Sequence, residues 1–439
     1  MVDDQGVPAI VPSGDRRDLI DRVAARVADL VQPTDPPGAD EFARALYEQI
    51  DEDELRVRAV DDLAAAAFEL WRLAEQRAPG TARVRVYAPP RGHSVVAVVV
   101  DDMPFIVDSI TMALDRHDFG VHLVAHPIVR VRRSATGELR GLAPDAAPAA
   151  DDDGALLESW THIEVDRETS AEILDDVRAD LERVLRDVRV ATTDWLEMLA
   201  ALQQVTRDLE HSPPPVAADE LHEGIALLHW LADQHFTFLG YRNYDLHPDG
   251  ALCPVAGSGL GLLRHAPERP SASFASLPAE VRAKARERTL LVLTKANARS
   301  TVHRPTYLDY VGVKRYDGRG NVVGEHRFLG LYTSSAYTRS PRDVPVLRRK
   351  VTRVIERAGF IPASHDQKDL AQILETYPRD DLFQIDDDHL YDTAMAILRL
   401  GGRRRVRLFV HREPYGRFVS CLVFLPRDRY TTQVRTRIG

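Results

Sequence analysis

Cysteine is scarce in this chain: only Cys253 and Cys421 occur, and they lie far apart in the sequence. Neither belongs to a paired spacing of the kind that marks disulfide frameworks and zinc sites. The sequence also lacks an HExxH motif and an Asp/Asn-rich calcium loop. We therefore predict no metal site, and we expect the protein to reside in the reducing cytoplasm.

Long apolar runs and an excess of positive charge are missing as well. No run approaches the roughly 20 apolar residues that a membrane-spanning helix requires, and the acidic start Met1-Val2-Asp3-Asp4 lacks the order of a signal peptide. The net charge of −10 disfavours a general nucleic-acid surface, which has to neutralise phosphates. A length of 439 residues, with 44% hydrophobic and 28% charged, is typical of a globular protein with several domains. We expect no nucleic-acid partner and no membrane.

Helical spacing dominates the beginning of the chain. Apolar residues recur at helical intervals from Leu19 to Leu30, and a stretch rich in Pro, Gly and Asp at residues 33–40 ends that helix. A second helical run covers residues 63–73. We assign residues 1–80 to an N-terminal helical segment.

The pattern then changes to a strand followed by a helix. Residues 95–100 form a continuous apolar run of the kind that a central strand shows. This strand ends at Asp101, and apolar residues at helical spacing follow over residues 106–114. Asp102 is a candidate N-cap, and Pro104 suits the first helical turn, where its missing N–H costs nothing.

Two strands and a helix complete this region. Strands are predicted at residues 121–131 and 158–166, with an Ala/Pro/Asp-rich loop at residues 134–154 between them, and apolar spacing predicts an amphipathic helix over residues 173–188. The order strand, helix, strand, strand, helix is most of a βαββαβ ferredoxin-like unit. We therefore assign residues 81–192 to an ACT-like domain, named after the small amino-acid-sensing modules of that architecture.

A second, strand-rich region follows a Pro-rich break at residues 212–215. A predicted helix at residues 221–231 precedes strands, of which those at residues 307–317 and 322–332 flank a turn, and further helices follow. An antiparallel sheet with helices packed on one side suits an α+β sensor-like domain. We place this domain at residues 218–400.

The C-terminal stretch has the pattern of a hairpin followed by a helix. Residues 406–410 and 418–424 flank a turn that contains Pro414 and Gly416, and a helix begins near Thr432. A lone hairpin with one helical turn buries too little apolar surface to form a domain. Either these strands extend an earlier sheet or the chain is cut inside a domain, and we favour the cut.

No motif for catalysis or cofactor binding fits its context. The segment Gly318–Gly324 resembles a dinucleotide-binding glycine loop, but its spacing is one residue too long and both flanks are predicted strands, whereas the fingerprint needs a helix after the turn. We interpret it as a hairpin turn. Gly257–Gly261 also misses the pattern and indicates a backbone bend near a sheet. We therefore predict no catalytic residue, no cofactor-binding residue and no cofactor in this chain.

Lys295 and three clustered histidines are the remaining candidates. Dehydrogenases of amino acids use a desolvated lysine to polarise the substrate. The sequence shows no desolvating or cationic neighbour for Lys295, so we expect a surface or interface role. His117, His122 and His126 span a helix end and a strand, and we expect satisfied core or surface histidines rather than metal ligands.

Several long and unusual runs carry a resemblance that covers nearly the whole chain beyond about residue 80. They are DDMPFIVDS (101–109), ESWTHIE (158–164), LTKANARSTVHRPTYLDYVGVKRYD (293–317), FLGLY (328–332), ILETYPRDDL (373–382) and GRFVSCLVFLPRDR (416–429). In these runs and in their order, the chain resembles the N-terminal, ACT-domain-bearing segment of the large class of NAD-specific glutamate dehydrogenases of bacteria.

That resemblance implies a very long chain in which regulatory modules precede a catalytic dehydrogenase domain. The reaction it implies converts L-glutamate, NAD and water into 2-oxoglutarate, ammonia and NADH in amino-acid catabolism. The implied fold class is α+β with tandem modules: the ferredoxin-like ACT-type domain, the sensor-like domain as a PAS-type antiparallel module, and a truncated second ACT-type domain at residues 403–439. The implied partners are the chain's own downstream catalytic domain, which would hold the NAD, and further copies in a homo-oligomer. This chain alone is expected to be inactive.

The resemblance also suggests where a small amino-acid effector binds. ACT-type modules often bind amino acids at the loop after the first strand. The candidate effector-binding residues are Asp101, Asp102, Met103, Pro104, Asp108 and Ser109. The ligand's ammonium would pair with Asp101 or Asp102, and its carboxylate would meet backbone N–H groups at the helix N-terminus. Alternatively, Asp102 only caps the helix. A rival function for the chain is a stand-alone, non-enzymatic amino-acid sensor or assembly scaffold.

Overall fold

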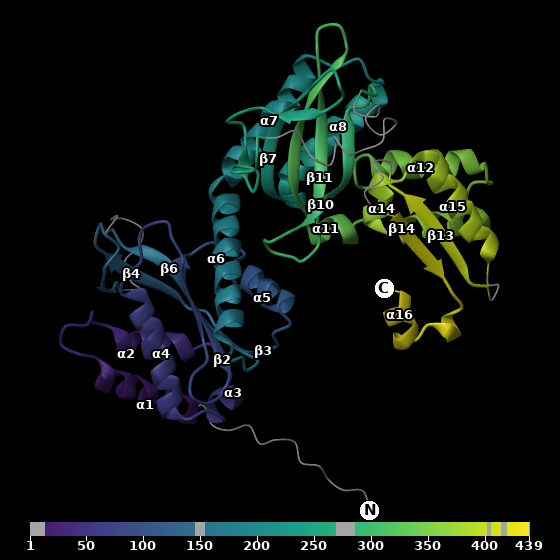
Figure 1. Ribbon diagram of the computed structural model, residues 1–439. Helices are drawn as coiled ribbons and strands as arrows, with labels where there is room; N and C mark the ends of the chain where they lie inside the picture. The colour runs from purple at the N-terminus through teal and green to yellow at the C-terminus, as the bar shows by residue number, and fades with distance from the viewer. Residues whose placement is uncertain (1–13, 145–153, 269–285, 402–404, 414–418, 439) are drawn as a thin grey trace, which may run out of the picture. The chain divides into compact units, whose positions relative to one another are not determined.

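A computed structural model describes residues 14–144, 154–268, 286–401, 405–413 and 419–438 of the chain (Figure 1). The contacts divide the chain into two compact units. The first comprises Met1–Arg189 and Thr301–Pro305, and the second comprises Val190–Ser300 and Thr306–Gly439. Both units combine helices with antiparallel sheets, so the predicted α+β class is confirmed.

The first unit consists of helices on both faces of one sheet. Its elements are α1 (Gly14–Leu30), α2 (Ala39–Tyr47), α3 (Glu52–Arg56), α4 (Val60–Ala74), β1 (Arg83–Tyr87), β2 (Ser94–Asp101), α5 (Ile106–Arg116), β3 (Val121–Ala125), β4 (Ile128–Arg133), β5 (Leu139–Leu142), β6 (Leu156–Val165) and α6 (Ala171–Thr193). The helices α2 and α3 lie within the predicted N-terminal helical segment but were not predicted individually, and the strand β5 was not predicted. β5 lies inside the predicted loop at residues 134–154, of which residues 145–153 are outside the described part of the chain.

The sheet of the first unit has the order β1-β2-β6-β4-β5, with β3 also beside β6, and every pairing is antiparallel. β3 and β4 pair with successive parts of β6, so the strand predicted over residues 121–131 is interrupted at His126 and Pro127. The central order β2-β6-β4, with α5 and α6 as connections, is that of a ferredoxin-like unit. β1 precedes β2 in the chain, yet it occupies the edge where the last strand of such a unit would lie.

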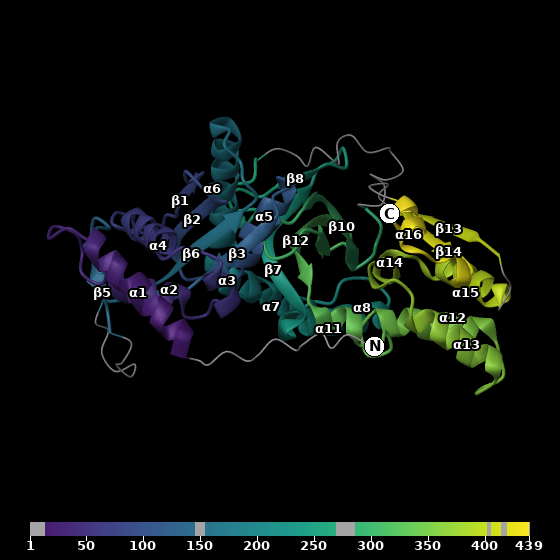
Figure 2. The ribbon, with the colours of Figure 1, turned by 90° about the horizontal axis from the view of Figure 1, so that it is seen from below.

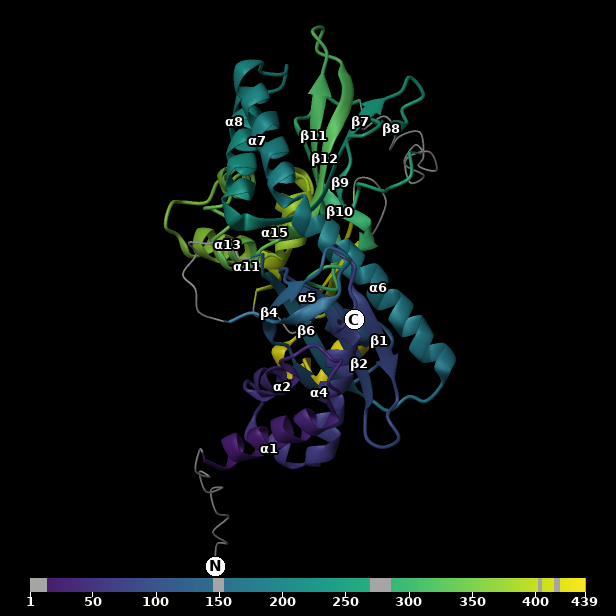
Figure 3. The same ribbon diagram turned by 90° about the vertical axis from the view of Figure 1, so that its left-hand side faces the viewer.

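The alternation of side chains along β2 gives each face of the sheet its own helices. Ala97 and Val99 belong to the core that α1, α2 and α4 form on one face. Val96 and Val98 are buried and, by the same alternation, point to the other face. The helices α5 and α6 lie on that face (Figures 1 and 3). Both faces of β2 are therefore buried, which explains its continuous apolar run.

The second unit begins with two helices that cover a second antiparallel sheet. Its elements are α7 (Trp195–His211), α8 (Ala218–Trp230), β7 (Phe236–Leu246), β8 (Leu252–Pro254), β9 (Leu260–Gly261), β10 (Leu291–Arg299), β11 (Tyr307–Tyr316), β12 (Val322–Tyr332), α11 (Ser334–Thr338), α12 (Leu347–Ala358), α13 (His365–Glu375), α14 (Arg379–Gln384), α15 (Asp387–Leu400), β13 (Arg407–Arg412), β14 (Val419–Phe424) and α16 (Thr432–Ile438). The helices α7, α11 and α14 were not predicted.

The larger sheet of this unit has the order β10-β11-β12-β7-β8, with β9 beside β7. β11 and β12 are joined by the turn at residues 317–321 and pair antiparallel, so the interpretation of Gly318–Gly324 as a hairpin turn is confirmed. The helices α12, α13 and α15 share a core with the sheet, and the apolar residues Phe409, Leu422 and Phe424 of the β13–β14 hairpin pack against it. The hairpin lies beside α14 and α15 (Figure 2).

β13 and β14 pair with each other as a two-stranded sheet, and α16 follows, as predicted. The predicted turn residues Pro414 and Gly416 lie outside the described residues. Within the described residues, no helix combines the length and the apolar character that crossing a bilayer requires.

Candidate effector site

The loop between β2 and α5 contains the residues predicted to bind an effector. α5 begins at Ile106, and Phe105 occupies its N-cap position with a left-handed φ of 71° and no capping side chain. The predictions that Asp102 caps this helix and that Pro104 lies in its first turn are therefore wrong. A left-handed conformation at a bulky residue costs about 1–3 kcal/mol, so the surroundings of the loop have to hold it in this shape.

Asp101, the last residue of β2, has both carboxylate oxygens engaged. Oδ1 accepts a hydrogen bond from Arg77 Nη2, and Oδ2 lies 2.6 Å from Arg189 Nη2 on α6. Burial would raise the pKa of Asp101, but the hydrogen bonds and charges of Arg77 and Arg189 outweigh it and lower the pKa. An incoming ammonium group would have to displace an arginine here. Asp101 therefore anchors the start of the loop.

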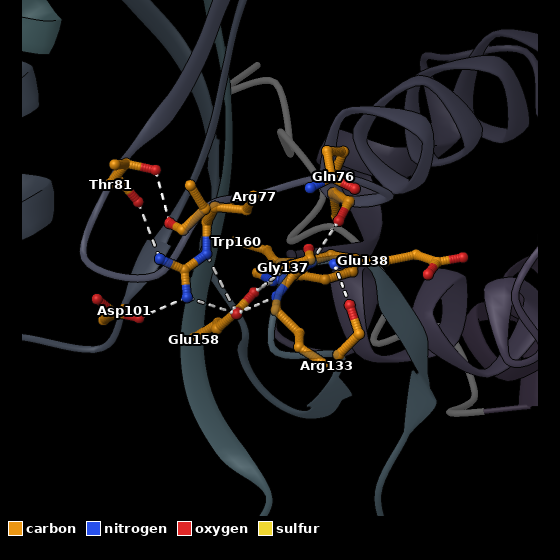
Figure 4. Close-up of polar contacts among 12 residues, drawn as sticks. Gln76, Arg77, Thr81, Asp101, Arg133, Gly137, Glu138, Glu158 and Trp160 are labelled. Carbon is orange, nitrogen blue, oxygen red and sulfur yellow. Dashed lines mark hydrogen bonds and ion pairs between the residues drawn. The ribbon is translucent and has the colours of Figure 1, made fainter.

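A buried ion-pair network lies behind Asp101 (Figure 4). Glu158 on β6 and Arg77 are both fully buried. Glu158 Oε1 lies 2.7 Å from Arg77 Nη2 and 2.6 Å from Arg133 Nε, and Oε2 accepts hydrogen bonds from Arg133 Nη2 and Trp160 Nε1, each at 2.8 Å. Burial opposes ionisation, but the two guanidinium groups lower the pKa of Glu158 overall. This is the arrangement that a buried carboxylate needs in order to stay ionised.

The run ESWTHIE on β6 explains this placement. Alternation along the strand turns Glu158, Trp160, His162 and Glu164 toward the face covered by α1–α4. Trp160 packs among aromatic rings of this core, with a centroid distance of 5.6 Å to Trp71.

Glu164 at the other end of the run is also paired. Arg58 Nε donates to both of its oxygens at 3.0 Å. Burial again opposes ionisation, but hydrogen bonds from His162 and Arg58 lower the pKa of Glu164 to about 2. The charged positions of this run are therefore tied to arginines that precede the strand by many residues.

The structure places the other predicted residues in two groups. Asp102 is exposed, and its backbone N–H donates to Leu157 O at 3.0 Å. Asp108 Oδ2 lies 3.0 Å from His303 Nδ1, and the buried Ser109 Oγ accepts a hydrogen bond from the His303 backbone N–H at 3.1 Å. His303 belongs to the short segment that groups with the first unit.

Of the six candidate residues, Asp102 and Pro104 are exposed in the loop and Met103 is half-buried. Asp101 faces the arginines, and Asp108 and Ser109 face His303. Sequence reasoning missed Arg77, Arg133, Arg189 and the role of Glu158. The available signal was a charged residue at an inward-facing position of a strand whose other inward residues are large, because such a residue requires a buried partner.

Lys295 differs from its prediction. It is only 8% exposed, and its Nζ lies 2.6 Å from Asp309 Oδ1 and 3.2 Å from Asp380 Oδ2. The expected surface role is therefore wrong. Burial raises the pKa of Asp309 to about 6, although Lys295 and the Tyr332 backbone N–H act in the opposite direction.

The three clustered histidines do not converge on one point. His122 Nε2 lies 2.7 Å from Asp166 Oδ1, and His117 Nε2 lies 3.4 Å from Asp180 Oδ2. Burial lowers the pKa of His126. Among the residues that the structure describes, no group of three or more His, Cys, Asp and Glu side chains is placed to hold a metal ion.

The fold defines a class of protein: α+β modules with antiparallel sheets, the first of them ferredoxin-like, joined to helical elements. Models of glutamate dehydrogenase regions match the chain in three places, the ACT1 domain at residues 42–181, helical motif 1 at residues 344–403 and the ACT2 domain at residues 407–439.

Curated relatives agree with these matches. The NAD-specific glutamate dehydrogenase of Halomonas elongata is 38% identical over 96% of this chain and 27% of its own length. That of Pseudomonas aeruginosa is 39% identical over 90% of this chain and 25% of its own length, and that of Mycobacterium tuberculosis is 32% identical over 83% and 22%. The chain belongs to the NAD-specific glutamate dehydrogenase family, and it spans about a quarter of the length of these relatives.

Proposed function

We propose that this chain is the N-terminal regulatory and assembly portion of a NAD-dependent glutamate dehydrogenase. The observation that carries the proposal is that relatives with this activity in their names match nearly the whole chain, while ACT1 and ACT2 matches flank a helical motif. The whole protein oxidatively deaminates L-glutamate with NAD, and residues beyond those of this chain bind the NAD and carry out the reaction.

Within the first unit, we propose that the loop at Asp102–Pro104 receives the amino-acid effector. Asp102 is exposed and takes the ammonium group, and the effector carboxylate meets backbone N–H groups at the start of α5. Asp101 contributes by fixing the loop through Arg77 and Arg189. Asp108 and Ser109 line the first turn of α5.

The remaining modules support the same assignment. We propose that residues 218–400 form a PAS-type sensor-like domain with its accompanying helices, because an antiparallel sheet here carries α8, together with the preceding α7, on one face. Residues 403–439 begin the second ACT-type domain, to which the β13–β14 hairpin and α16 belong. The whole protein acts in the cytoplasm as a homo-oligomer.

The proposal is tested on the native polypeptide. An antibody raised against residues 84–190 should detect a band several times larger than 49.2 kDa, and the purified protein should form NADH from NAD in the presence of L-glutamate. A native band at 49.2 kDa without that activity would contradict the proposal and favour a stand-alone sensor or scaffold.

The effector loop is tested by calorimetric titration of common amino acids into the 439-residue chain. Asp102→Asn should abolish the heat of binding that depends on this loop. Asp115→Asn is the matched control, because Asp115 is exposed on the same helix near its other end. The effector loop is disproved if no amino acid binds or if both variants bind like the parent chain.

A further inference from the structure

The second unit contains a cavity of about 810 Å³ that the sites described above do not use. One wall is the last part of α7 with the Pro-rich segment after it. The other wall is the end of β11, its turn to β12, and His326 on β12. α7 and α8 lie along the same face of these strands (Figure 3). The volume of the cavity falls within the range of small-molecule sites, about 300–1,000 Å³.

Local sequence explains why the cavity forms here. The prolines at residues 213–215 prevent α7 from continuing. The turn that faces them is stabilised by Asp317, whose Oδ1 accepts hydrogen bonds from the backbone N–H groups of Arg319 and Asn321 at 2.9 and 2.8 Å. Gly320 has a φ of 77°, and a Cβ there would lie 2.8 Å from Pro215 Cγ. Turn and Pro-rich segment therefore touch at one end of the cavity.

The floor of the cavity is apolar. Val205 and Leu209 on α7 and Val313 on β11 line it, and all three are buried members of the core of this unit. An apolar group placed against them is removed from water, which contributes about 25 cal/mol per Å² of buried surface.

Charges of both signs stand above this floor. Alternation along β11 turns Arg315 to the same face as Val313, and Arg319 projects from the exposed turn. Asp208 on α7 supplies a carboxylate. Arg315 is 3.0 Å from Asp245 and thus already shares its charge, whereas no ion pair of Arg319 is found among the described residues.

His326 lines the same cavity and is influenced by charges of both signs. Burial, and with it the charge of Arg315, lowers its pKa to about 4, although the charge of Asp208 acts in the opposite direction. The imidazole is therefore neutral at pH 7, and both charges lie near enough to act on it. Its Nδ1 is 3.0 Å from Tyr241 Oη, so Nε2 is the ring nitrogen that can meet a ligand.

These groups select a ligand by charge. A simple anion can pair with Arg315 or Arg319 but offers no partner to Asp208, and a simple cation can pair with Asp208 but offers none to the arginines. A molecule that carries a positive and a negative charge close together can pair with Asp208 and with the arginines at the same time. An apolar body is needed to cover the floor.

We infer that this cavity binds a free α-amino acid with an apolar side chain. The carboxylate meets Arg315 and Arg319, the ammonium group meets Asp208, and the side chain lies on the apolar floor. This site is separate from the Asp102 loop and does not depend on the proposed enzymatic activity.

Calorimetry on the 439-residue chain tests the ligand class, with L-leucine, L-methionine and L-phenylalanine as probes. At least one should bind saturably, and N-acetyl-L-leucine and L-leucinamide, each lacking one charge, should bind at least 10-fold more weakly than L-leucine. Absence of binding by all three amino acids overturns the inference, and so does equal binding of the blocked analogues.

Substitutions locate the site. Asp208→Asn and Arg315→Gln should each weaken binding at least 10-fold, whereas Glu210→Gln, an exposed position on the same helix that does not line the cavity, should bind like the parent chain. Arg319→Gln should also weaken binding, and because Arg319 is on an exposed turn this variant is informative even if Arg315→Gln does not fold. Binding that survives Asp208→Asn and Arg319→Gln but is lost in Asp102→Asn places the ligand in the first unit and overturns the inference.

Discussion

Two buried carboxylates, one in each unit, are neutralised in different ways. In the first unit, Glu158 receives two guanidinium groups and an indole N–H, and its pKa is lowered in spite of complete burial. In the second unit, a single ammonium group, that of Lys295, lies between two carboxylates, and burial raises the pKa of Asp309 to about 6.

The difference shows how the number and shape of the donors decide whether a buried acid stays charged. A guanidinium group offers several N–H donors in a fixed fork, so two arginines can satisfy every lone pair of one carboxylate. A lysine is a compact point charge, and here it is shared. The arginine-paired carboxylates of the first unit and Asp309 of the second unit should therefore respond in opposite ways to their removal and to pH.

The largest effect is expected for Glu158→Gln. It leaves Arg133 buried without its carboxylate partner and Arg77 with Asp101 alone, which costs about 3–5 kcal/mol of the free energy of unfolding. Urea unfolding should be followed by fluorescence in a Trp195→Phe, Trp230→Phe background, where only the two tryptophans of the first unit remain. Glu138→Gln is the control, since that side chain is 52% exposed. A loss below about 1 kcal/mol would contradict the role of the network.

The second effect concerns acid. The pKa of Glu164 is lowered from 4.5 to about 2, so its stabilising contribution is present above pH 4.5 and is lost as the pH falls toward 2. The contribution amounts to about 3 kcal/mol. Glu164→Gln should flatten the acid side of the stability profile of the first unit, measured by urea unfolding between pH 2 and pH 7. If the variant loses stability in acid as steeply as the parent chain, groups other than Glu164 cause that loss.

Asp309→Asn should act in the opposite direction. Because the pKa of Asp309 is raised from 3.8 to about 6, its contribution to stability is present below pH 3.8 and is lost as the pH rises through 6. Asn cannot ionise, so the variant should be more stable than the parent at pH 7 by about 1–2 kcal/mol, and the advantage should shrink toward pH 4. Hydrogen exchange of peptides from β10 and β11, compared at equal pH, measures this. If the variant is less stable than the parent at pH 7, the ionised Asp309 stabilises the fold, and the contrast with the arginine-paired carboxylates of the first unit is wrong.

The smallest effect is expected for Asp102→Asn. Asp102 is exposed, so the substitution should change the free energy of unfolding by less than about 0.5 kcal/mol, even though it removes the proposed ammonium partner. A thermal melt of the parent and the variant measures this. A larger loss of stability would mean that Asp102 belongs to the structural network rather than to the effector loop.

Elements with a clear local period could be predicted from the sequence. The strand β2, the helices α5 and α6 and the β11–β12 hairpin follow from apolar spacing and turn residues. α7 was missed because only Asp194 separates it from α6, and neither Pro nor Gly marks the change of direction. The carboxylate of Asp194 instead binds Arg264 and the backbone N–H of Gly261.

The candidate site was predicted only in part, because its supports are distant in the sequence. The loop after β2 lies where it was predicted, but the N-cap of α5 does not, since the left-handed conformation of Phe105 leaves no local signal in the sequence. Arg77 and Glu158 are 81 residues apart, and Lys295 meets carboxylates on β11 and at α14. Such pairs depend on the tertiary fold and not on any short pattern.

The position of β1 has a consequence for where the gene can be shortened. β1 comes before β2 but covers its outer edge. A protein that starts at residue 88 therefore loses, besides α1–α4, the strand that shields this edge of β2. The main-chain N–H and C=O groups along β2 then become a template for a strand of another molecule. The boundary of the module therefore has to be drawn upstream of β1, and a later start is expected to produce aggregates.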